Sequence, residues 1–593
     1  WNSRELRLKA GRDIRLEGMV DGRPKGDGQT DGSLSLRYGL ATSDGVENGR
    51  QARLKIHAPI RLPAGQNFSE KIGSSGNLDN YTVITSLGSP GSTSGTDLQG
   101  MDGNLSTNFA LGADIDASAT ASWNSGKGFD PIGGLNNNNF PIPFAGNFHG
   151  LGNRILDLTI QRPNTPYVGL FAAVSGNKGV SHLRLVDALV AGSDFTGGLT
   201  GGVRPRVISG GYSTPTITDV HINGVVSGRD YVGGITGEVQ NVTQDYVSVE
   251  RVSMGGRVSN GNHGLSIDHG GVIGFLISGE VKDLYSDADV DADENVGGIV
   301  GSSTADGEIT NSYAIGSLNA RNASEAGSIV GSQSGTITNS FGVNTASPFT
   351  ESTYGTENGG TWTGFDFDDT WFMVDGDTRP MLRNKRYSRV TDGHELQLMR
   401  AAPDQDYTLA NDIDLSNEIT ANNGIWRDGF VPIGDTSAEG AFTGSLNGNS
   451  KTITGLVVNR DENLTDGLLG DVNGGTVSSL TLENADLTTG DGQSGDDGNI
   501  TVSNGVTLTG TVNLDAGTGN VSVNQAIGSN ANPATSVSIS GTDLNLPAVT
   551  TSSGQTYQAT GTITATGDLT SQGGSSEIRA NHVQFSPNQA FAI

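Results

Sequence analysis

A five-residue glycine phrase recurs along the middle of the chain and constrains its fold more than any other feature. Two small residues, a branched apolar residue, one further residue and a glycine occur at Gly197–Gly201, Gly233–Gly237, Gly270–Gly274, Gly297–Gly301 and Gly327–Gly331. The steps between successive phrases are 36, 37, 27 and 30 residues, which is too long for a helical heptad. Self-similarity at this period indicates stacked supersecondary units, none of which buries its apolar face alone.

Short β-branched runs separated by glycine, asparagine and aspartate predict an all-β chain. Glycine accounts for 89 of the 593 residues, but without a Gly-X-Y period, which excludes collagen. Two or three strands for every thirty residues correspond to one turn of a parallel β-helix. We expect the repeated glycines to provide positive φ and close backbone approach at its corners, and the branched residue to point inward.

The charge balance excludes several classes of partner. The formal net charge is −29, which argues against nucleic-acid binding and against docking on anionic lipid. The chain has no cysteine, hence no disulfide or thiolate zinc site, and no apolar run long enough for a membrane span. It opens at Trp1 without a signal peptide, and we expect it to be an excised piece of a longer protein.

A longer period of 298 residues divides the chain into modules. Asp97–Met101 matches Glu395–Met399 at that offset, and Asp114–Asp116 matches Asp412–Asp414. A capping box predicts a short helix at the start of the second copy, where Asp392 caps it and Glu395 follows three residues later. The predicted divisions are shaft repeats at 1–92, a full module at 93–390 with repeats at about 166–345 and an aromatic closing segment at 346–390, a partial module at 391–490, and shaft repeats at 491–593.

The glycine phrase and the strand after it resemble a known repeat. Gly-Gly-Ile-x-Gly at 297–301, followed by Ile-Thr-Asn-Ser-Tyr-Ala at 309–314, resembles the GLUG repeat of large bacterial surface proteins. Together with the flanking units such as Leu6–Ile14, the succession is similar to filamentous-haemagglutinin-like exoproteins exported by two-partner secretion. The resemblance implies a right-handed parallel β-helix (solenoid) with loop insertions and one or two short helices.

The same resemblance implies a secreted, cell-surface-associated adhesin or biofilm-matrix fibre that binds without catalysis. Its expected partners are extracellular polysaccharide, a host or neighbouring-cell surface, and an outer-membrane two-partner transporter for export of the full-length protein. Self-association through exposed strand edges is a further expectation. We expect no nucleic-acid binding and no membrane insertion.

The densest run of carboxylates is a candidate cation site. Alternate acids on a strand project from one face, and several of them together suit a hard cation such as calcium, the one cofactor that the sequence leaves open. The run does not follow the EF-hand pattern, and a solvated acidic face is the alternative. The candidate ligands are Asp287, Asp289, Asp291 and Asp293.

Aromatic residues crowd together at the end of the full module. Trp362 and Trp371 are candidates for stacking against sugar rings, if they are exposed. The alternative is an aromatic plug that seals the last turn before the next module begins.

The competing functional class is a β-helical carbohydrate-active enzyme, a polysaccharide lyase or hydrolase that uses paired carboxylates. Asp114 and Asp116 form such a pair, but their recurrence as Asp412 and Asp414 indicates an architectural role. GLUG repeats also accompany some secreted zinc endopeptidases. His394-Glu395 begins like a zinc-protease helix, yet Leu398 stands where the second histidine is needed. We therefore predict no enzymatic activity and no catalytic residue.

Overall fold

The computed structural model shows a chain that is mostly β, with 50% of it in strands and 5% in a few short helices. None of the described sheets closes on itself, and none of the described helices is long and apolar enough to cross a membrane. The structure describes residues 4–24, 31–177, 179–208, 211–241, 247–261, 263–321, 326–342, 357, 362–416, 418–419, 424–434, 440–460, 467–489, 500–502, 506–516, 520–587 and 591–592.

The chain divides into two compact units. Unit 1 contains residues 1–350 and 360–366, and unit 2 contains residues 351–359 and 367–593. The division falls inside the predicted closing segment, of which the structure describes residue 357 and residues from 362 onward. The predicted module boundaries at 92, 390 and 490 stay predictions.

Unit 1 begins with short strands, most of which pair in parallel, whereas the strands at 46–47 and 50–51 and those at 65–72 and 79–84 pair antiparallel. Leu6 of β1 pairs with Leu34 of β4, which pairs in turn with Phe68 of β9. The alternation of leucine with polar residues in these segments therefore marks strands, as the sequence predicts. The elements are β1 (Glu5–Lys9), β2 (Ile14–Leu16), β3 (Val20–Asp21), β4 (Ser33–Tyr38), β5 (Val46–Glu47), β6 (Arg50–Gln51), β7 (Leu54–Ile56), β8 (Ile60–Arg61), β9 (Gly65–Ile72), β10 (Asp79–Ile84), η1 (Gln99–Gly103), β11 (Phe109–Leu111), β12 (Ile115–Asp116), η2 (Ser118–Gly126), β13 (Phe148–His149), β14 (Arg154–Leu156) and β15 (Thr159–Gln161).

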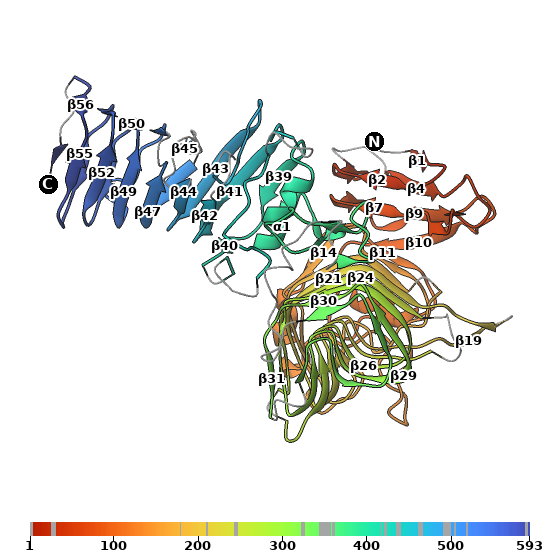
Figure 1. The fold of residues 1–593 in the computed structure, drawn as a ribbon. Coiled ribbons are helices and arrows are strands. Elements are labelled where there is room, and N and C mark those ends of the chain that lie inside the picture. The colour runs from red at the N-terminus through yellow and green to blue at the C-terminus, as the bar shows by residue number, and fades with distance from the viewer. Residues whose placement is uncertain are drawn as a thin grey trace. The chain divides into compact units, whose positions relative to one another are not determined.

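The glycine phrases lie among parallel strands (Figure 1), which we call the glycine ladder (residues 180–342). One antiparallel pair, 207–208 with 211–212, is inserted in this range. Thr200 pairs with Thr236, Thr236 with Ile273, Ile273 with Val300, and Val300 with Val330. Its strands are β16 (Val180–Ala191), β17 (Thr196–Gly197), β18 (Thr200–Val203), β19 (Val207–Ile208), β20 (Gly211–Tyr212), β21 (Thr216–Ser227), β22 (Asp230–Gly233), β23 (Thr236–Val239), β24 (Ser248–Ser259), β25 (Ile267–Gly270), β26 (Ile273–Ser286), β27 (Asp289–Ala292), β28 (Glu294–Gly297), β29 (Val300–Thr310), β30 (Tyr313–Ala314), β31 (Leu318–Ala320), β32 (Ala326–Gly327), β33 (Val330–Gln333), β34 (Thr336–Thr338) and β35 (Phe341–Gly342).

The branched residue of every glycine phrase is buried, as expected. Leu199, Ile235, Val272 and Ile299 are 0% exposed and Ile329 is 5% exposed, and all five belong to one apolar cluster of unit 1. Successive phrases therefore stack their apolar residues on one another, so each step of the ladder completes the core of the next.

Of the two roles expected for the repeated glycines, positive φ is wrong and close backbone approach is confirmed. None of the described phrase glycines has positive φ. They are required because a Cβ would collide with backbone: at Gly297 it would lie 1.8 Å from the Val300 carbonyl oxygen, and at Gly233 2.2 Å from that of Thr236. Close approach alone therefore explains the phrase.

Positive φ occurs instead at glycines outside the phrases, such as Gly224 and Gly256, and at non-glycine residues, most of which form two columns in the ladder. In each column, residues on successive strands share one register position and the left-handed conformation. We call them the first column (His182, Asp219, Arg251, Asp283, Asn311 and Asn339) and the second column (Tyr167, Phe195, Tyr231, Asp268 and Asn295). Most side chains other than asparagine and aspartate adopt this conformation at a cost, so the corners of the ladder hold strain.

Unit 2 opens with the predicted capping box. The Asp392 carboxylate accepts a hydrogen bond from the Glu395 backbone N–H at 2.8 Å, and the Glu395 carboxylate reaches back to the Thr391 N–H at 2.8 Å. Helix α1 (Gly393–Leu398) begins there, so the sequence signal for this helix is confirmed. The surrounding elements are β36 (Trp371–Phe372), β37 (Met381–Leu382), η6 (Arg383–Lys385), β38 (Arg389–Val390), η7 (Met399–Ala401), β39 (Asp406–Leu409), β40 (Ile413–Asp414), β41 (Ser445–Thr454), β42 (Val457–Arg460), β43 (Thr476–Glu483) and β44 (Asp486–Thr489).

The rest of unit 2 is a second set of parallel strands, which we call the C-terminal ladder (residues 500–592). Val512 pairs with Val537, Ile539 with Tyr557, and Tyr557 with Ile578. Figure 1 shows β47, β49, β52 and β55 following one another in this order. Its strands are β45 (Ile500–Val502), β46 (Val506–Thr509), β47 (Thr511–Asp515), β48 (Val521–Val523), β49 (Ser536–Gly541), β50 (Leu544–Leu546), β51 (Val549–Thr551), β52 (Gln555–Ala559), β53 (Thr562–Ala565), β54 (Leu569–Ser571), β55 (Glu577–Arg579), β56 (His582–Phe585) and β57 (Phe591–Ala592).

Candidate binding surface

The four predicted calcium ligands lie on and beside β27 and alternate with buried residues. Ala288 and Val290 are 1% exposed and Ala292 is 5% exposed, so the aspartates between them face away from the core. Within the described part of the chain, no group of three or more acidic or histidine side chains is placed to hold a metal ion. The candidate ligands Asp287, Asp289, Asp291 and Asp293 therefore do not converge on one point, and calcium binding stays a prediction.

Neighbouring strands supply cations to two of these carboxylates. Arg257 of β24 donates to Asp291 at 3.0 Å, and the Arg321 guanidinium lies 2.6 Å from Asp293. Both arginine side chains are more than half exposed, so each pair contributes little to stability. The arrangement is that of the predicted alternative, a solvated acidic face.

The sugar-stacking prediction for the two tryptophans is wrong, because both are buried. Trp362 is 1% exposed and packs edge-on against Tyr313 at 5.3 Å, Phe341 at 5.0 Å and Phe365 at 5.0 Å. Trp371 is 0% exposed and lies in β36. Neither ring has a free face for a sugar. The contact of Trp362 with Phe341, on the last strand of the glycine ladder, fits the alternative prediction, an aromatic plug at the end of the module.

The paired carboxylates of the enzyme alternative have structural partners. Asp114 accepts from the Arg154 backbone N–H at 2.9 Å and from its guanidinium at 3.1 Å. Asp116 accepts from the Ser118 backbone N–H at 2.9 Å. In the second copy, Asp414 accepts from Ser416 in the same way, also at 2.9 Å. The recurrent aspartates thus hold equivalent turns in the two copies.

A surface that the sequence analysis missed runs along the second column. Tyr167 stacks on Phe195 at 4.6 Å and Phe195 on Tyr231 at 4.7 Å, with ring planes 5° and 10° apart. Phe275 continues the stack at 5.3 Å. Because the faces of the middle rings are occupied by their neighbours, this stack presents ring edges to solvent and contributes mainly to stability.

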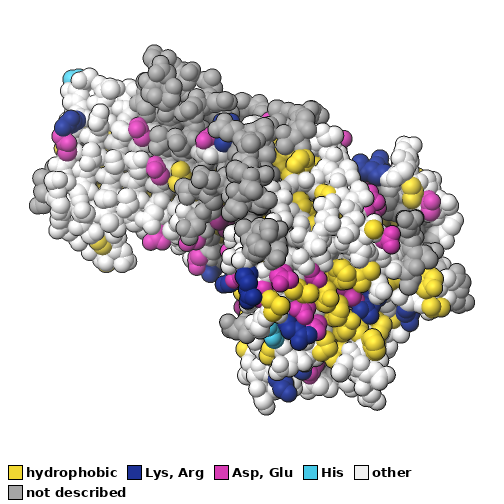
Figure 2. All heavy atoms as spheres, turned by 60° about the horizontal axis from the view of Figure 1, so that its bottom comes forward, with side chains coloured by type: hydrophobic (Ala, Val, Ile, Leu, Met, Phe, Trp, Pro, Cys, Tyr) yellow, Lys and Arg dark blue, Asp and Glu magenta, His cyan; other side chains and the backbone are white. Residues whose placement is uncertain are grey.

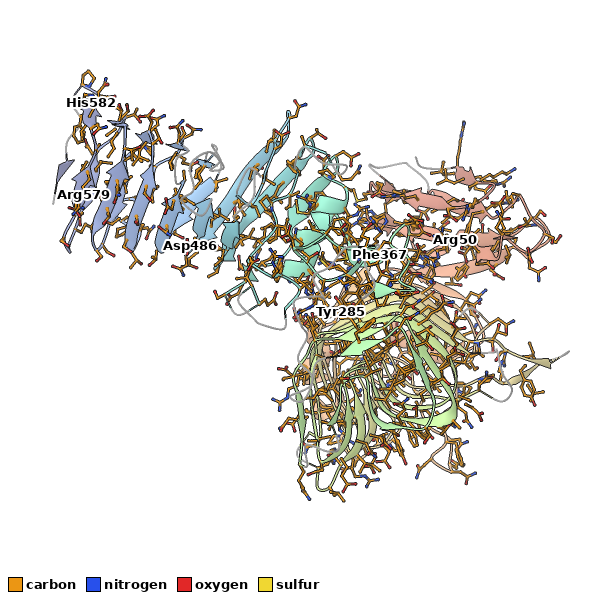
Figure 3. The ribbon with its side chains drawn as sticks, in the orientation of Figure 1. Arg50, Tyr285, Phe367, Asp486, Arg579 and His582 are labelled. Carbon is orange, nitrogen blue, oxygen red and sulfur yellow. The ribbon has the colours of Figure 1, made fainter. Side chains whose placement is uncertain are left out.

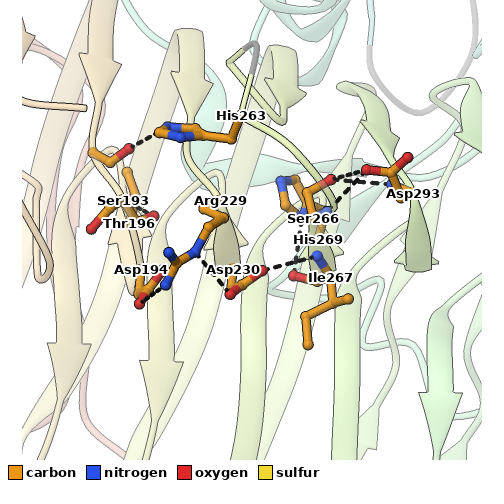
Figure 4. Close-up of polar contacts among 11 residues, drawn as sticks. Ser193, Asp194, Thr196, Arg229, Asp230, His263, Ser266, Ile267, His269 and Asp293 are labelled. Atoms are coloured by element: carbon orange, nitrogen blue, oxygen red, sulfur yellow. Dashed lines mark hydrogen bonds and ion pairs between the residues drawn. The ribbon is translucent and has the colours of Figure 1, made fainter. Parts of the chain in front are cut away.

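Charged side chains flank the stack on the same corner. The Arg229 guanidinium lies 2.5 Å from Asp194 and 3.1 Å from Asp230, and Asp230 also accepts from the Ile267 backbone N–H at 3.2 Å (Figure 4). Arg229 remains 48% exposed. We call Asp194, Phe195, Arg229, Asp230, Tyr231 and Asp268 the corner ridge.

Two buried carboxylates lie at the ridge, Asp268 within it and Glu238 beside it. Burial raises the pKa of Glu238, although its ion pair with Arg204 opposes this. Burial also raises the pKa of Asp268, against the hydrogen bond that its carboxylate accepts from Asn295 at 2.7 Å. The ridge therefore combines half-buried rings, acids and one exposed cation, a combination suited to binding polar ligands. A signal for it was present in the sequence, since Tyr167, Phe195 and Tyr231 each stand two residues before a glycine phrase or its equivalent.

Acidic side chains of the described residues are distributed over the face that Figure 2 shows. In Figure 2, Asp and Glu side chains occur singly or in small groups across the visible face. On unit 2, Asp486, Arg579 and His582 project from separate strands (Figure 3). Asp486 accepts from Asn513 on the next strand at 2.8 Å, and Arg579 pairs with Glu577 at 2.6 Å.

Comparison with known proteins identifies one motif. A family described as "The GLUG motif" matches residues 292–319, which cover β28, β29 and β30. Halomucin of Haloquadratum walsbyi is 36% identical over 134 residues, a match that covers 22% of this chain. The chain spans about 1% of the length of halomucin.

One solved structure is similar over part of its length. A putative immunoglobulin A1 protease from Bacteroides ovatus matches 44% of this chain and 74% of that chain, with 19% identity and a TM-score of 0.34. At this TM-score the likeness supports no inference about fold or activity.

Proposed function

We propose that this chain is a segment of a large secreted, cell-surface-associated adhesin or matrix fibre that binds extracellular polysaccharide or a neighbouring cell surface without catalysis. We also propose that its ladders are right-handed parallel β-helices. The observation that carries both proposals is the pairing of strands in chain order, in which Thr200, Thr236, Ile273, Val300 and Val330 occupy one register position. Such stacking gives an extended surface.

The two sequence matches support the surface location. The GLUG motif lies within the glycine ladder, and halomucin is a protein long enough for the matched segment to be about 1% of it. The resemblance to filamentous-haemagglutinin-like exoproteins further suggests export of the full-length protein by an outer-membrane two-partner transporter. The acidic surface, with its net charge of −29, favours neutral or cationic partners over anionic ones.

The distribution of charged groups supports binding over catalysis. A carbohydrate-active enzyme concentrates acids and bases around one reacting bond. Here Asp114, Asp116 and Asp414 hold turns, and the acids of β27 have arginine partners or face solvent. We therefore propose that the chain binds its partner through many weak contacts distributed over its surface.

A glycan array, with and without calcium, tests this function. The labelled chain should bind one class of extracellular polysaccharide, and Arg229→Ala should weaken binding by at most a few-fold, because no single contact dominates. Arg579→Ala is the matched control, because Arg579 is also an exposed, ion-paired arginine but lies on the C-terminal ladder. Release of reducing ends or unsaturated sugars from the bound polysaccharide would instead establish the enzyme. Absence of binding to every glycan would contradict the adhesin proposal.

A further inference from the structure

One histidine occupies a core position where the neighbouring strands carry small or branched side chains. His269 of β25 pairs with Val232 of β22 on one side and with Val296 of β28 on the other. Thr196 of β17 precedes them at the same register position. His269 is 0% exposed, like Val232 and Val296. An imidazole thus replaces an aliphatic side chain in the middle of the glycine ladder.

The contacts of this imidazole fit its neutral form. Its Nδ1 lies 3.2 Å from the Ile267 carbonyl oxygen (Figure 4), and since a carbonyl only accepts, we assign the proton to Nδ1. Its Nε2 is buried and has no hydrogen-bond partner among the described residues. A proton added at Nε2 would therefore place a full positive charge in a site that is shielded from water.

The charged groups nearby do not compensate for that burial. They are Arg229 and Asp230 on the β22 side, Glu294 on β28, Asp268 on β25 itself, and Asp194, His263 and Asp293 in the adjoining corners. Burial lowers the pKa of His269 to about 4, although the carbonyls of Ile267, Gly228 and Ser259 and the charge of Asp230 favour protonation. Desolvation is the larger effect.

We propose that His269 makes the glycine ladder acid-labile at β25, so that protonation of its imidazole opens the pairing of β22, β25 and β28 and exposes their strand edges. Because the imidazole is harder to protonate in the closed ladder than in the open chain, the open form binds the additional proton. Stability of this segment is therefore complete above the usual histidine pKa and falls as the pH drops toward 4. Exposed edges are sites for pairing with another strand. The proposal does not depend on the proposed binding function.

Hydrogen exchange followed by mass spectrometry on the whole chain tests this. After correction for the intrinsic pH dependence of exchange, peptides covering residues 228–236 and 264–300 should open about 30-fold more often at pH 5.0 than at pH 7.5. Peptides from β49 and β52 in unit 2 provide the reference, because they contain no histidine.

Two variants isolate the imidazole. His269→Val copies the residues above and below it, and His269→Thr copies Thr196, so one variant remains informative if the other fails to fold. Either should abolish the local acid response, whereas His263→Asn, in the neighbouring turn, should retain it. An unchanged acid response in the His269 variants, or no local response in the unmodified chain, would overturn the proposal.

Discussion

The glycine ladder and the C-terminal ladder are both parallel arrangements paired in chain order, yet they turn their corners differently. In the glycine ladder, the steps from phrase to phrase are 27 to 37 residues, and two columns of non-glycine residues adopt positive φ. In the C-terminal ladder, paired residues of neighbouring strands lie 18 to 25 residues apart in sequence, and no described non-glycine residue after Asn484 has positive φ. Longer steps thus come with strained corners, and shorter steps do without them.

The two ladders also differ in how they use charge. Arg251, in the first column, is 9% exposed and contacts Asp219 at 3.1 and 3.2 Å and Glu250 at 2.6 Å. Burial lowers its pKa, but the two carboxylates outweigh burial and the pKa is raised overall. Arg579 of the C-terminal ladder contacts Glu577 while 69% exposed. An arginine–carboxylate pair is therefore buried and important for stability in the glycine ladder, but exposed and of little importance for stability in the C-terminal ladder.

The largest expected effect separates these two ion pairs. Arg251→Ala should lower the free energy of unfolding of unit 1 by about 3 kcal/mol, because it removes a buried guanidinium and leaves the part-buried Asp219 carboxylate without this ion pair, while Glu250 keeps Lys282 at 3.3 Å. Arg579→Ala should change the stability of unit 2 by no more than about 0.5 kcal/mol. Urea unfolding followed by circular dichroism measures both. Equal losses would remove the distinction between the ladders.

The next effect tests close approach at the glycine phrase. Gly297→Ala should cost about 3 kcal/mol, since the new Cβ would lie 1.8 Å from the Val300 carbonyl oxygen and the backbone must move. Gly264→Ala is the matched control, because nothing lies within 4 Å of its Cβ position. Thermal unfolding should show a lower midpoint for the first variant alone. A tolerated alanine at 297 would contradict close backbone approach as the reason for this glycine.

A smaller effect concerns the stacked rings of the second column. Phe195→Ala should cost about 2 kcal/mol, because it removes stacking on both Tyr167 and Tyr231. Phe195→Asn should recover about 1 kcal/mol of this loss, since asparagine tolerates the φ of 56° at this position better than alanine. Hydrogen exchange in β17 and β22 compares the two variants. If asparagine and alanine behave alike, the left-handed conformation carries no cost there.

The smallest effect is a pH dependence at Asp268. Its pKa is raised, so the folded chain holds the proton more tightly than the unfolded chain, and stability falls as the pH rises through that pKa. Asp268→Asn should therefore stabilise unit 1 at pH 7 by less than about 1 kcal/mol and not at pH 3. Denaturant midpoints at the two pH values give the comparison. A stabilisation that is the same at both pH values would assign the gain to backbone preference alone.

Much of the architecture followed from periodicity, and the errors have physical causes. The glycine spacing predicted stacked strands, and the buried Leu199 and Ile235 bear out the inward branched residue. The Asp392 capping box was predictable because its partners are local in sequence. The run Ile309–Ala314 was expected as one strand, but Asn311 turns left-handed and divides it into the end of β29 and β30. A short polar side chain allowed that turn, and alternation alone does not reveal it.

The exposure of the tryptophans and the partners of the acidic residues could not be predicted from the sequence. Trp362 looked like a free aromatic platform, but its contacts with Tyr313 and Phe341 lie 49 and 21 residues away in the chain. The partners of Asp291 and Asp293 lie on the neighbouring steps, at Arg257 and Arg321, and only the pairing register brings them together. Predicting such contacts requires the pairing register of the neighbouring strands, which the spacing of the glycine phrases does not give.

Nearest-neighbour pairing has a consequence for how a chain of this kind changes its length. Each phrase of the glycine ladder matches its predecessor and its successor at the same register position, and the 27- to 37-residue steps differ mainly outside the paired positions. Duplication or loss of one whole step would rejoin surfaces that already fit, whereas an insertion within a paired strand would not. Recombination between repeats can therefore shorten or extend the protein by whole steps, because the apolar residues of the rejoined steps already pack against one another.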